Sequence, residues 1–153
     1  MAAIIAEADL RTHDVILGAV SSAATTLENL IVATLAVSDM TQRDSLARMA
    51  DLLEQRFIQL KPAAPDVFST SPWSIIETAI KTAIADGDLL DDIDIAAAAL
   101  TIRAALLGAR LMSDSAAEDV FGRTAKVWQV ILRGNVPPQK LPYFDLFVTR
   151  VAE

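Results

Sequence analysis

Two segments of this chain are apolar on nearly every side, and they restrict the fold more than any other feature. Ala23–Val37 and Ile95–Met112 carry few charged residues and predict helices without a polar face. A helix of that kind is usually buried on all sides. A monomer of 153 residues has difficulty burying two such helices. We therefore expect the first to be the central helix of the domain and the second to pack against another copy of the chain.

The remaining sequence also favours helices. Alanine is abundant, runs of alternating β-branched residues are absent, and glycine and proline gather at a few breaks. Alanine loses no side-chain entropy in a helix, which makes it the best helix former. The sequence predicts an all-α bundle of about six helices forming a single domain over residues 1–153, which dimerises through its last two long helices.

Local signals predict where several helices begin and end. Capping boxes at Thr41–Asp44 and Ser115–Glu118 and the Ser71-Pro72 pair are typical of helix starts, and Asp92 or Asp94 begins the long alanine-rich helix. The helix from Thr41 carries its apolar stripe at three- and four-residue spacing. Helix ends are expected at Gly87, near Met112 and at Gly134. A weak break falls at Gly18–Ser22, and Asp145–Val151 predicts a short final helix.

The composition excludes several classes of function. The chain has no cysteine and a single histidine, His13, so thiolate sites and multi-histidine metal sites are excluded. Its net charge of −7 disfavours nucleic-acid binding by this chain alone. Neither apolar segment is free of polar residues, and no basic leader precedes Glu7, so we expect a cytoplasmic protein without a membrane span. No cofactor, metal site or catalytic residue is predicted.

The order of several weak motifs suggests a family. Ser71-Pro72-Trp73 starts a helix, Gly87–Asp94 reads Gly-Asp-Leu-Leu-Asp-Asp-Ile-Asp, and a long alanine-rich helix follows. This order resembles the C-terminal regulatory domain of TetR-family transcription repressors. Finer similarity to the γ-butyrolactone receptor branch from actinobacteria lies in Leu106–Ser113 and in Arg123–Trp128.

The resemblance implies a small-molecule effector and a homodimer. Members of the family begin with a basic helix-turn-helix that binds DNA. Ile4–Glu7 resembles the start of the helix that follows this DNA-binding domain, so we expect this chain to lack the domain. Trp73 matches the tryptophan that packs over the ligand in that branch. The implied effector is small and apolar or lactone-like. Leu107 stands where a ligand-bonding threonine is common, so the effector is expected to be more apolar than a hydroxylated butyrolactone or to be held differently.

Four of the predicted ligand-binding residues, Leu53, Phe57, Ile76 and Ile80, share facing stripes of consecutive helices, although core packing is the more frequent role for any one of them. Trp73 and Leu107 are implied by the resemblance, and Thr34 is a possible polar contact on the central helix. The full predicted set is Trp73, Leu107, Ile76, Ile80, Phe57, Leu53 and Thr34. The predicted dimer-interface residues lie on the last two long helices. They are Ala105, Gly108, Met112 and Trp128, the last of which also suits the core.

Two other functions remain open at this point. The chain could be a structural or interaction module with a filled core and no ligand. It could also be a helical-bundle enzyme, but the sequence contains no recognisable nucleophile–base pair, histidine–carboxylate cluster or glycine-rich phosphate loop. An enclosed apolar cavity touching Trp73 would favour the ligand-binding domain over both.

Overall fold

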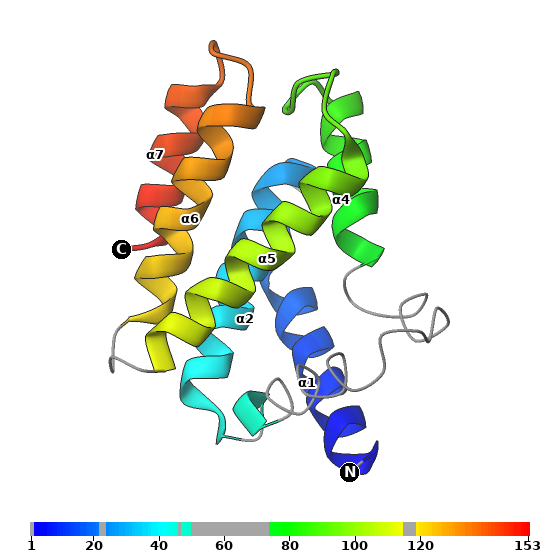
Figure 1. The fold of residues 1–153 in the computed structure, drawn as a ribbon, viewed down its shortest axis with the longest axis vertical. Coiled ribbons are helices and arrows are strands. Elements are labelled where there is room, and N and C mark those ends of the chain that lie inside the picture. The colour runs from blue at the N-terminus through cyan, green and yellow to red at the C-terminus, as the bar shows by residue number, and fades with distance from the viewer. Residues whose placement is uncertain (1, 22–23, 46, 50–73, 115–118) are drawn as a thin grey trace.

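The computed structural model describes residues 2–21, 24–45, 47–49, 74–114 and 119–153, and these residues form helices and connecting loops without a strand. The expected all-α fold is confirmed. Figure 1 shows the bundle. Its helices are α1 (Ala2–Ala19), α2 (Thr26–Arg43), α4 (Ser74–Ala85), α5 (Ile95–Asp114), α6 (Val120–Asn135) and α7 (Leu141–Val151).

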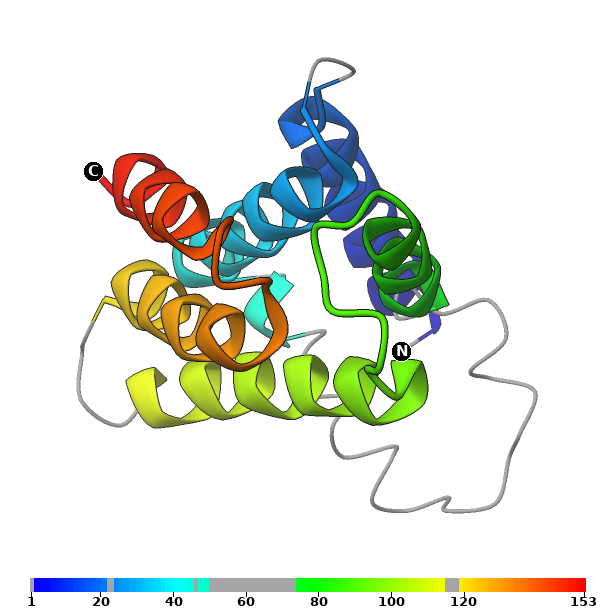
Figure 2. The same ribbon diagram turned by 90° about the horizontal axis from the view of Figure 1, so that it is seen from above.

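Helix α2 is the central element. It contacts α1, α4, α6 and α7, and Figure 2 shows it between the α6–α7 pair and the α1–α4 pair. Leu27, Ile31 and Leu35 project from it into the core and are almost completely buried. The prediction of a central apolar helix is therefore confirmed, with the helix beginning at Thr26, after its N-cap Thr25, and extending to Arg43.

The start of α2 is fixed by a capping box that the sequence analysis did not identify. The Glu28 N–H donates to the Thr25 hydroxyl at 3.3 Å, and the Thr25 N–H donates to the Glu28 carboxylate at 2.7 Å. Two N–H groups that the helix leaves without a carbonyl partner are thereby bonded. The segment Thr25–Glu28 carries the Thr-x-x-Glu pattern, so the signal was present.

The predicted helix start at Thr41 is wrong. Thr41 is buried in the last turn of α2, where its hydroxyl donates to the Val37 carbonyl at 2.7 Å instead of capping a new helix. The next helical residues begin at Ser45, after Asp44, whose side chain accepts from the Ala47 N–H at 3.5 Å. Threonine caps a helix only where the backbone leaves the preceding one, and here the preceding helix continues.

The end of α4 and the start of α5 follow their predicted signals. Gly87 has a φ of 70°, the left-handed conformation that glycine adopts without a Cβ penalty. The Gly87 N–H bonds the Ile84 carbonyl at 3.0 Å and the Asp88 N–H bonds the Ala83 carbonyl at 2.9 Å, the paired bonds of a Schellman motif. Asp94 caps α5 by accepting from the Ala97 N–H at 3.0 Å. The proposed start at Ser71-Pro72 lies outside the described residues.

Helices α6 and α7 form an antiparallel pair at the C-terminal end. The capping box at residues 115–118 lies outside the described residues, and the first helical residue after them is Val120. Helix α7 begins at Leu141, four residues before the predicted Asp145, with Pro142 in its first turn. Phe144 and Val148 of α7 are buried in the core, so this helix is a full packing element.

Helix α5 lies along one edge of the bundle and is buried on one side only (Figure 2). Ile102, Leu106 and Ala109 face inward, whereas Leu100 and Met112 are more than 60% exposed. Among the described helices, α5 alone is long and apolar enough to cross a membrane, and 28% of its Ile95–Met112 window is buried in the chain. A helix at a subunit interface has the same length and composition, so this property assigns no membrane.

Candidate functional site

A cavity of about 310 Å³ lies where α2, α4, α5 and α6 meet. Ligand pockets commonly have volumes of about 300–1,000 Å³, so this one suits a small ligand. Its wall is mostly apolar. The apolar side chains that line it are Leu27, Leu30, Ile80, Leu89, Ile93, Ala97, Ala98, Ile102, Trp128, Ile131 and Leu132.

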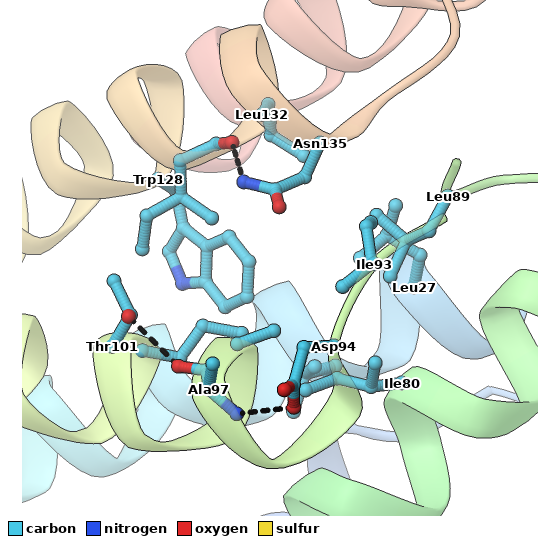
Figure 3. A pocket seen from close by; sticks show the side chains of 14 residues that line it. Leu27, Ile80, Leu89, Ile93, Asp94, Ala97, Thr101, Trp128, Leu132 and Asn135 are labelled. Carbon is cyan, nitrogen blue, oxygen red and sulfur yellow. Dashed lines mark hydrogen bonds between the residues drawn. The ribbon is translucent and has the colours of Figure 1, made fainter. Parts of the chain in front are cut away.

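Trp128 is the largest group in the wall. Figure 3 shows its indole ring standing between α5 and α6 beside the cavity. The indole Nε1 donates a hydrogen bond to the Thr34 hydroxyl at 2.7 Å, and that hydroxyl donates to the Ile31 carbonyl at 2.8 Å. Because the indole N–H of Trp128 is already bonded to Thr34 of α2, only the carbon atoms of the ring face the cavity.

Buried hydroxyls continue this connection between α2 and α6. The Thr124 hydroxyl lies 3.1 Å from the Ser38 hydroxyl, and Ser38 donates to the Thr34 carbonyl at 2.9 Å. Thr124 and Ser38 are both completely buried. Because an unpaired polar group in a core is costly, these bonds favour one register between the two helices. That register places Trp128 against the cavity.

The polar groups of the wall are a carboxylate, an amide and a hydroxyl. Asp94 lies at the N-terminal end of α5 and Asn135 at the C-terminal end of α6, on opposite sides of the cavity in Figure 3. Thr101 lies one turn beyond Ala97, and its hydroxyl donates to the Ala97 carbonyl at 2.8 Å. Among the described residues that line the cavity, none is a lysine or an arginine.

The loop between α4 and α5 forms one end of the cavity and is attached to the α6–α7 junction. Leu89, Ile93 and Asp94 of this loop line the cavity. The Leu90 N–H donates to the Asn135 carbonyl at 2.9 Å. The Lys140 Nζ lies 2.7 Å from Asp88 Oδ1, and the Asp88 side chain is 6% exposed. Breaking an ion pair with one buried partner costs more than breaking a surface pair, because the buried charge is left without its counterion.

Glu28 connects α2 to α7 near the same end of the bundle. Besides its part in the capping box, this buried carboxylate accepts a hydrogen bond from the Tyr143 hydroxyl. The bond to Glu28, together with desolvation, raises the pKa of Tyr143 above its ordinary value of 10.0. The charge of Asp88 acts in the same direction, and that of Arg150 opposes it.

The structure brings only part of the predicted ligand site together. Ile80 lines the cavity, whereas Ile76 is buried in the core without lining it, and Leu107 is half-buried on α5 outside the lining. Thr34 does not line the cavity but accepts the hydrogen bond of Trp128, which does. Trp73, Leu53 and Phe57 lie outside the described residues.

The predicted interface residues also separate into two groups. Ala105 and Gly108 are half-buried on α5 and Met112 is exposed there, so all three are accessible to a second chain. Trp128 is 1% exposed and lines the cavity of its own chain. This corrects its assignment to the interface, because a side chain with no free surface has nothing for a partner to cover.

Sequence reasoning missed most of the wall. Leu89, Ile93 and Asn135 occupy a loop and a helix end, where an apolar residue or an amide carries no periodic signal. Asp94 was recognised as a helix start and not as a cavity residue. Among the described residues, no group of three or more His, Asp or Glu side chains could hold a metal ion.

Comparisons with known proteins agree on one architecture. Residues 24–137 match the sequence family described as "Tetracyclin repressor-like, C-terminal domain". No curated protein sequence matches the chain. A solved gamma-butyrolactone receptor (ArpA-like protein) is similar with a TM-score of 0.77 at 18% identity, over 98% of this chain and 71% of the receptor chain.

Two further solved structures are similar over most of the chain. The TetR family protein CprB from S. coelicolor A3(2) has a TM-score of 0.76 at 19% identity, over 99% of this chain and 72% of its own. Full-length TylP, a TetR regulator from Streptomyces fradiae, has a TM-score of 0.67 at 18% identity, over 92% of this chain and 66% of its own. At these identities the likeness establishes the fold.

Proposed function

This chain belongs to the family of tetracycline-repressor-like C-terminal domains, and on that premise we propose that it is a regulatory domain that binds a small apolar or lactone-like effector and forms a homodimer. The observation that carries the proposal is the cavity beside Trp128, with its largely apolar wall. A largely apolar cavity of this size supports a ligand-binding domain over a structural module.

The proposed effector lies against the carbon part of the Trp128 ring. Leu30 and Ile102 supply apolar contacts from α2 and α5, which suits an alkyl chain. The similarity to a gamma-butyrolactone receptor supports the lactone as the first compound to test. We propose no catalysis, since domains of this family are typically regulatory.

Dimerisation is proposed through α5. Its outward face is apolar, with Leu100 and Met112 exposed. A Cβ added at Gly108 would meet no heavy atom of the chain within 4 Å, so a second helix has room to approach there. Obligate interfaces commonly bury more than about 2,000 Å², and an apolar helix face of this length contributes to such an area.

The chain is proposed to act in the cytoplasm and to bind no DNA by itself, in line with its net charge of −7. Its output is instead a change between two arrangements of the dimer, which requires only that the effector bind one arrangement more tightly.

Tryptophan fluorescence tests the effector site. The chain has two tryptophans, so Trp73→Phe leaves Trp128 as the single reporter. A γ-butyrolactone with an alkyl side chain should quench or shift Trp128 emission with saturation. The converse variant, Trp128→Phe, reports whether the ligand also reaches Trp73.

A matched pair of α5 variants controls this experiment. Ala97→Leu reduces the cavity and should weaken binding about tenfold or more, whereas Ala96→Leu places the same bulk on a neighbouring residue that does not line it. If neither tryptophan signal saturates and calorimetry detects no heat of binding, the effector site is refuted and the structural module is favoured.

A further inference from the structure

The hydrogen-bonding groups of the cavity wall are mostly acceptors. The indole N–H of Trp128 is used on Thr34, and the Thr101 hydroxyl donates to the Ala97 carbonyl. Asp94 has no proton to donate when ionised. The groups that remain available to a ligand are therefore chiefly oxygen lone pairs.

Asn135 presents one of these oxygens to the cavity. Its amide nitrogen donates to the Ile131 carbonyl at 2.7 Å, one helical turn earlier. Figure 3 shows the amide oxygen turned away from that bond, toward the space beside Trp128. The amide oxygen accepts no hydrogen bond within the part of the chain that the structure describes. The second N–H of the same amide is the only side-chain donor of the wall without a partner there.

Asp94 supplies the charge. One carboxylate oxygen accepts from the Ala97 N–H, and the side chain lies on the side of the cavity opposite Asn135 (Figure 3). Cations are absent from the described lining. Lys140, at the α6–α7 junction, is paired with Asp88 of this loop. Asp94 is exposed and caps α5, so solvent and the helix N-terminus offset part of its charge, but it remains the only ionisable side chain of the described lining.

The neighbouring loop adds charge of the same sign. Asp86, Asp91 and Asp92 are exposed in the segment that leads to Asp94. Charges of one sign around an opening raise the local concentration of oppositely charged ligands and lower that of like-charged ones. A carboxylate ligand would approach Asp94 against this field.

Resting on the proposed function, we propose that Asp94 and Asn135 are specificity-determining residues that select ligands by head group. The site prefers an alkyl compound whose head donates hydrogen bonds, an alcohol or an ammonium, over a lactone that only accepts. It rejects a carboxylate. The head lies between Asp94 and Asn135 and the chain lies along Trp128.

The test compares probes with the same alkyl chain and different heads: a primary ammonium, an alcohol, a γ-lactone and a carboxylate. Binding is measured by Trp128 emission in the Trp73→Phe protein below the aggregation concentration of each probe. The ammonium and the alcohol should bind most tightly, the lactone less so, and the carboxylate at least about tenfold more weakly than the ammonium.

Asp94→Asn isolates the charge. Asparagine is an equally good helix cap, so α5 should keep its start while the ammonium loses about tenfold in affinity and the carboxylate gains. Asp91→Asn removes an equal charge from the same loop at a residue that is exposed, like Asp94, but does not line the cavity. At physiological salt it should change the ratio of ammonium to carboxylate affinity much less than Asp94→Asn does. Asn135→Ala should weaken the alcohol about fivefold and leave an alkane of the same length unaffected.

Two results would overturn the inference while the proposed function stands. One is equal affinity for all four head groups. The other is an equal change in the ratio of ammonium to carboxylate affinity in Asp91→Asn and Asp94→Asn. If no probe changes Trp128 emission, the proposed function itself fails. Circular dichroism of each variant verifies that the helices are retained.

Discussion

Trp128 and Thr34 are 94 positions apart in the chain, and a 2.7 Å hydrogen bond from the indole Nε1 to the threonine hydroxyl joins them. The bond connects α6 to the central helix α2 and holds the largest side chain of the cavity wall. The indole N–H is buried, so removing its acceptor should lower the free energy of unfolding.

Thr34→Val should lower the free energy of unfolding by about 1–3 kcal/mol, because it leaves the buried indole N–H without an acceptor. Urea unfolding followed by circular dichroism measures the change. Thr34→Ser keeps the hydroxyl and should lose less than half as much. Equal losses in the two variants would mean that the methyl group, and not the hydrogen bond, is what stabilises this contact.

Lys140→Met should destabilise the domain by about 1–3 kcal/mol. The substitution leaves the Asp88 carboxylate, whose side chain is 6% exposed, without its cation. Lys126→Met, at an exposed residue of α6, is the matched control and should be neutral within about 0.5 kcal/mol. Adding Asp88→Asn to Lys140→Met should restore part of the stability, and a double variant less stable than Lys140→Met alone would contradict the assignment.

Tyr143 should titrate above the ordinary tyrosine pKa. Its protonated form is stabilised in the folded state, chiefly by the hydrogen bond to Glu28, so the folded state holds its proton to higher pH than the unfolded state. The stability from this bond is complete below about pH 10 and is lost as pH rises through the folded pKa.

The chain contains a single tyrosine, so the ultraviolet absorbance of the phenolate reports Tyr143 alone. Glu28→Gln should lower the observed pKa. Tyr143→Phe should cost about 0.5–1.5 kcal/mol near neutral pH and progressively less above pH 10. A pKa that is the same with and without the Glu28 carboxylate would refute the role of this bond.

Gly108→Arg should produce a folded monomer. The chain itself leaves space for a side chain at Gly108, so the substitution conflicts only with a second copy. Light scattering should show half the mass of the parent protein with unchanged helix content. Gly18→Arg, at a second glycine with open space, should leave the dimer intact. A parent protein that is monomeric at micromolar concentration would rule out the proposed dimer.

Local chemistry explains which parts of the fold could be predicted. The left-handed Gly87, the cap at Asp94 and the apolar face of α2 are decided by neighbours within one or two turns, and the sequence displays those neighbours. Thr41 shows the limit of such reasoning. Its capping pattern is genuine, but the helix before it continues, and the hydroxyl bonds inside that helix.

The cavity could not be predicted in the same way because its wall comes from distant segments. Leu27, Ile80 and Trp128 meet only after α2, α4 and α6 have packed. From sequence, an aromatic residue on an amphipathic helix suits a core or an interface equally well. Trp128 lies in the core because hydrogen bonds to hydroxyls of α2 fix how α6 packs. The separation of Leu107 from the cavity is likewise a matter of helix rotation, which no local motif encodes.

Helix α2 connects the cavity at one end to helix α1 at the other. It spans 18 residues, about 27 Å at 1.5 Å per residue, with Leu27 and Leu30 at the cavity and Asp44 just past its far end. Asp44 Oδ2 lies 2.9 Å from an Arg11 nitrogen of α1. A tilt of about 3° at the cavity end would displace the far end by about 1.4 Å, similar to the helix shifts seen in allosteric proteins. The Arg11–Asp44 contact is therefore the point at which such a tilt would be passed from α2 to α1.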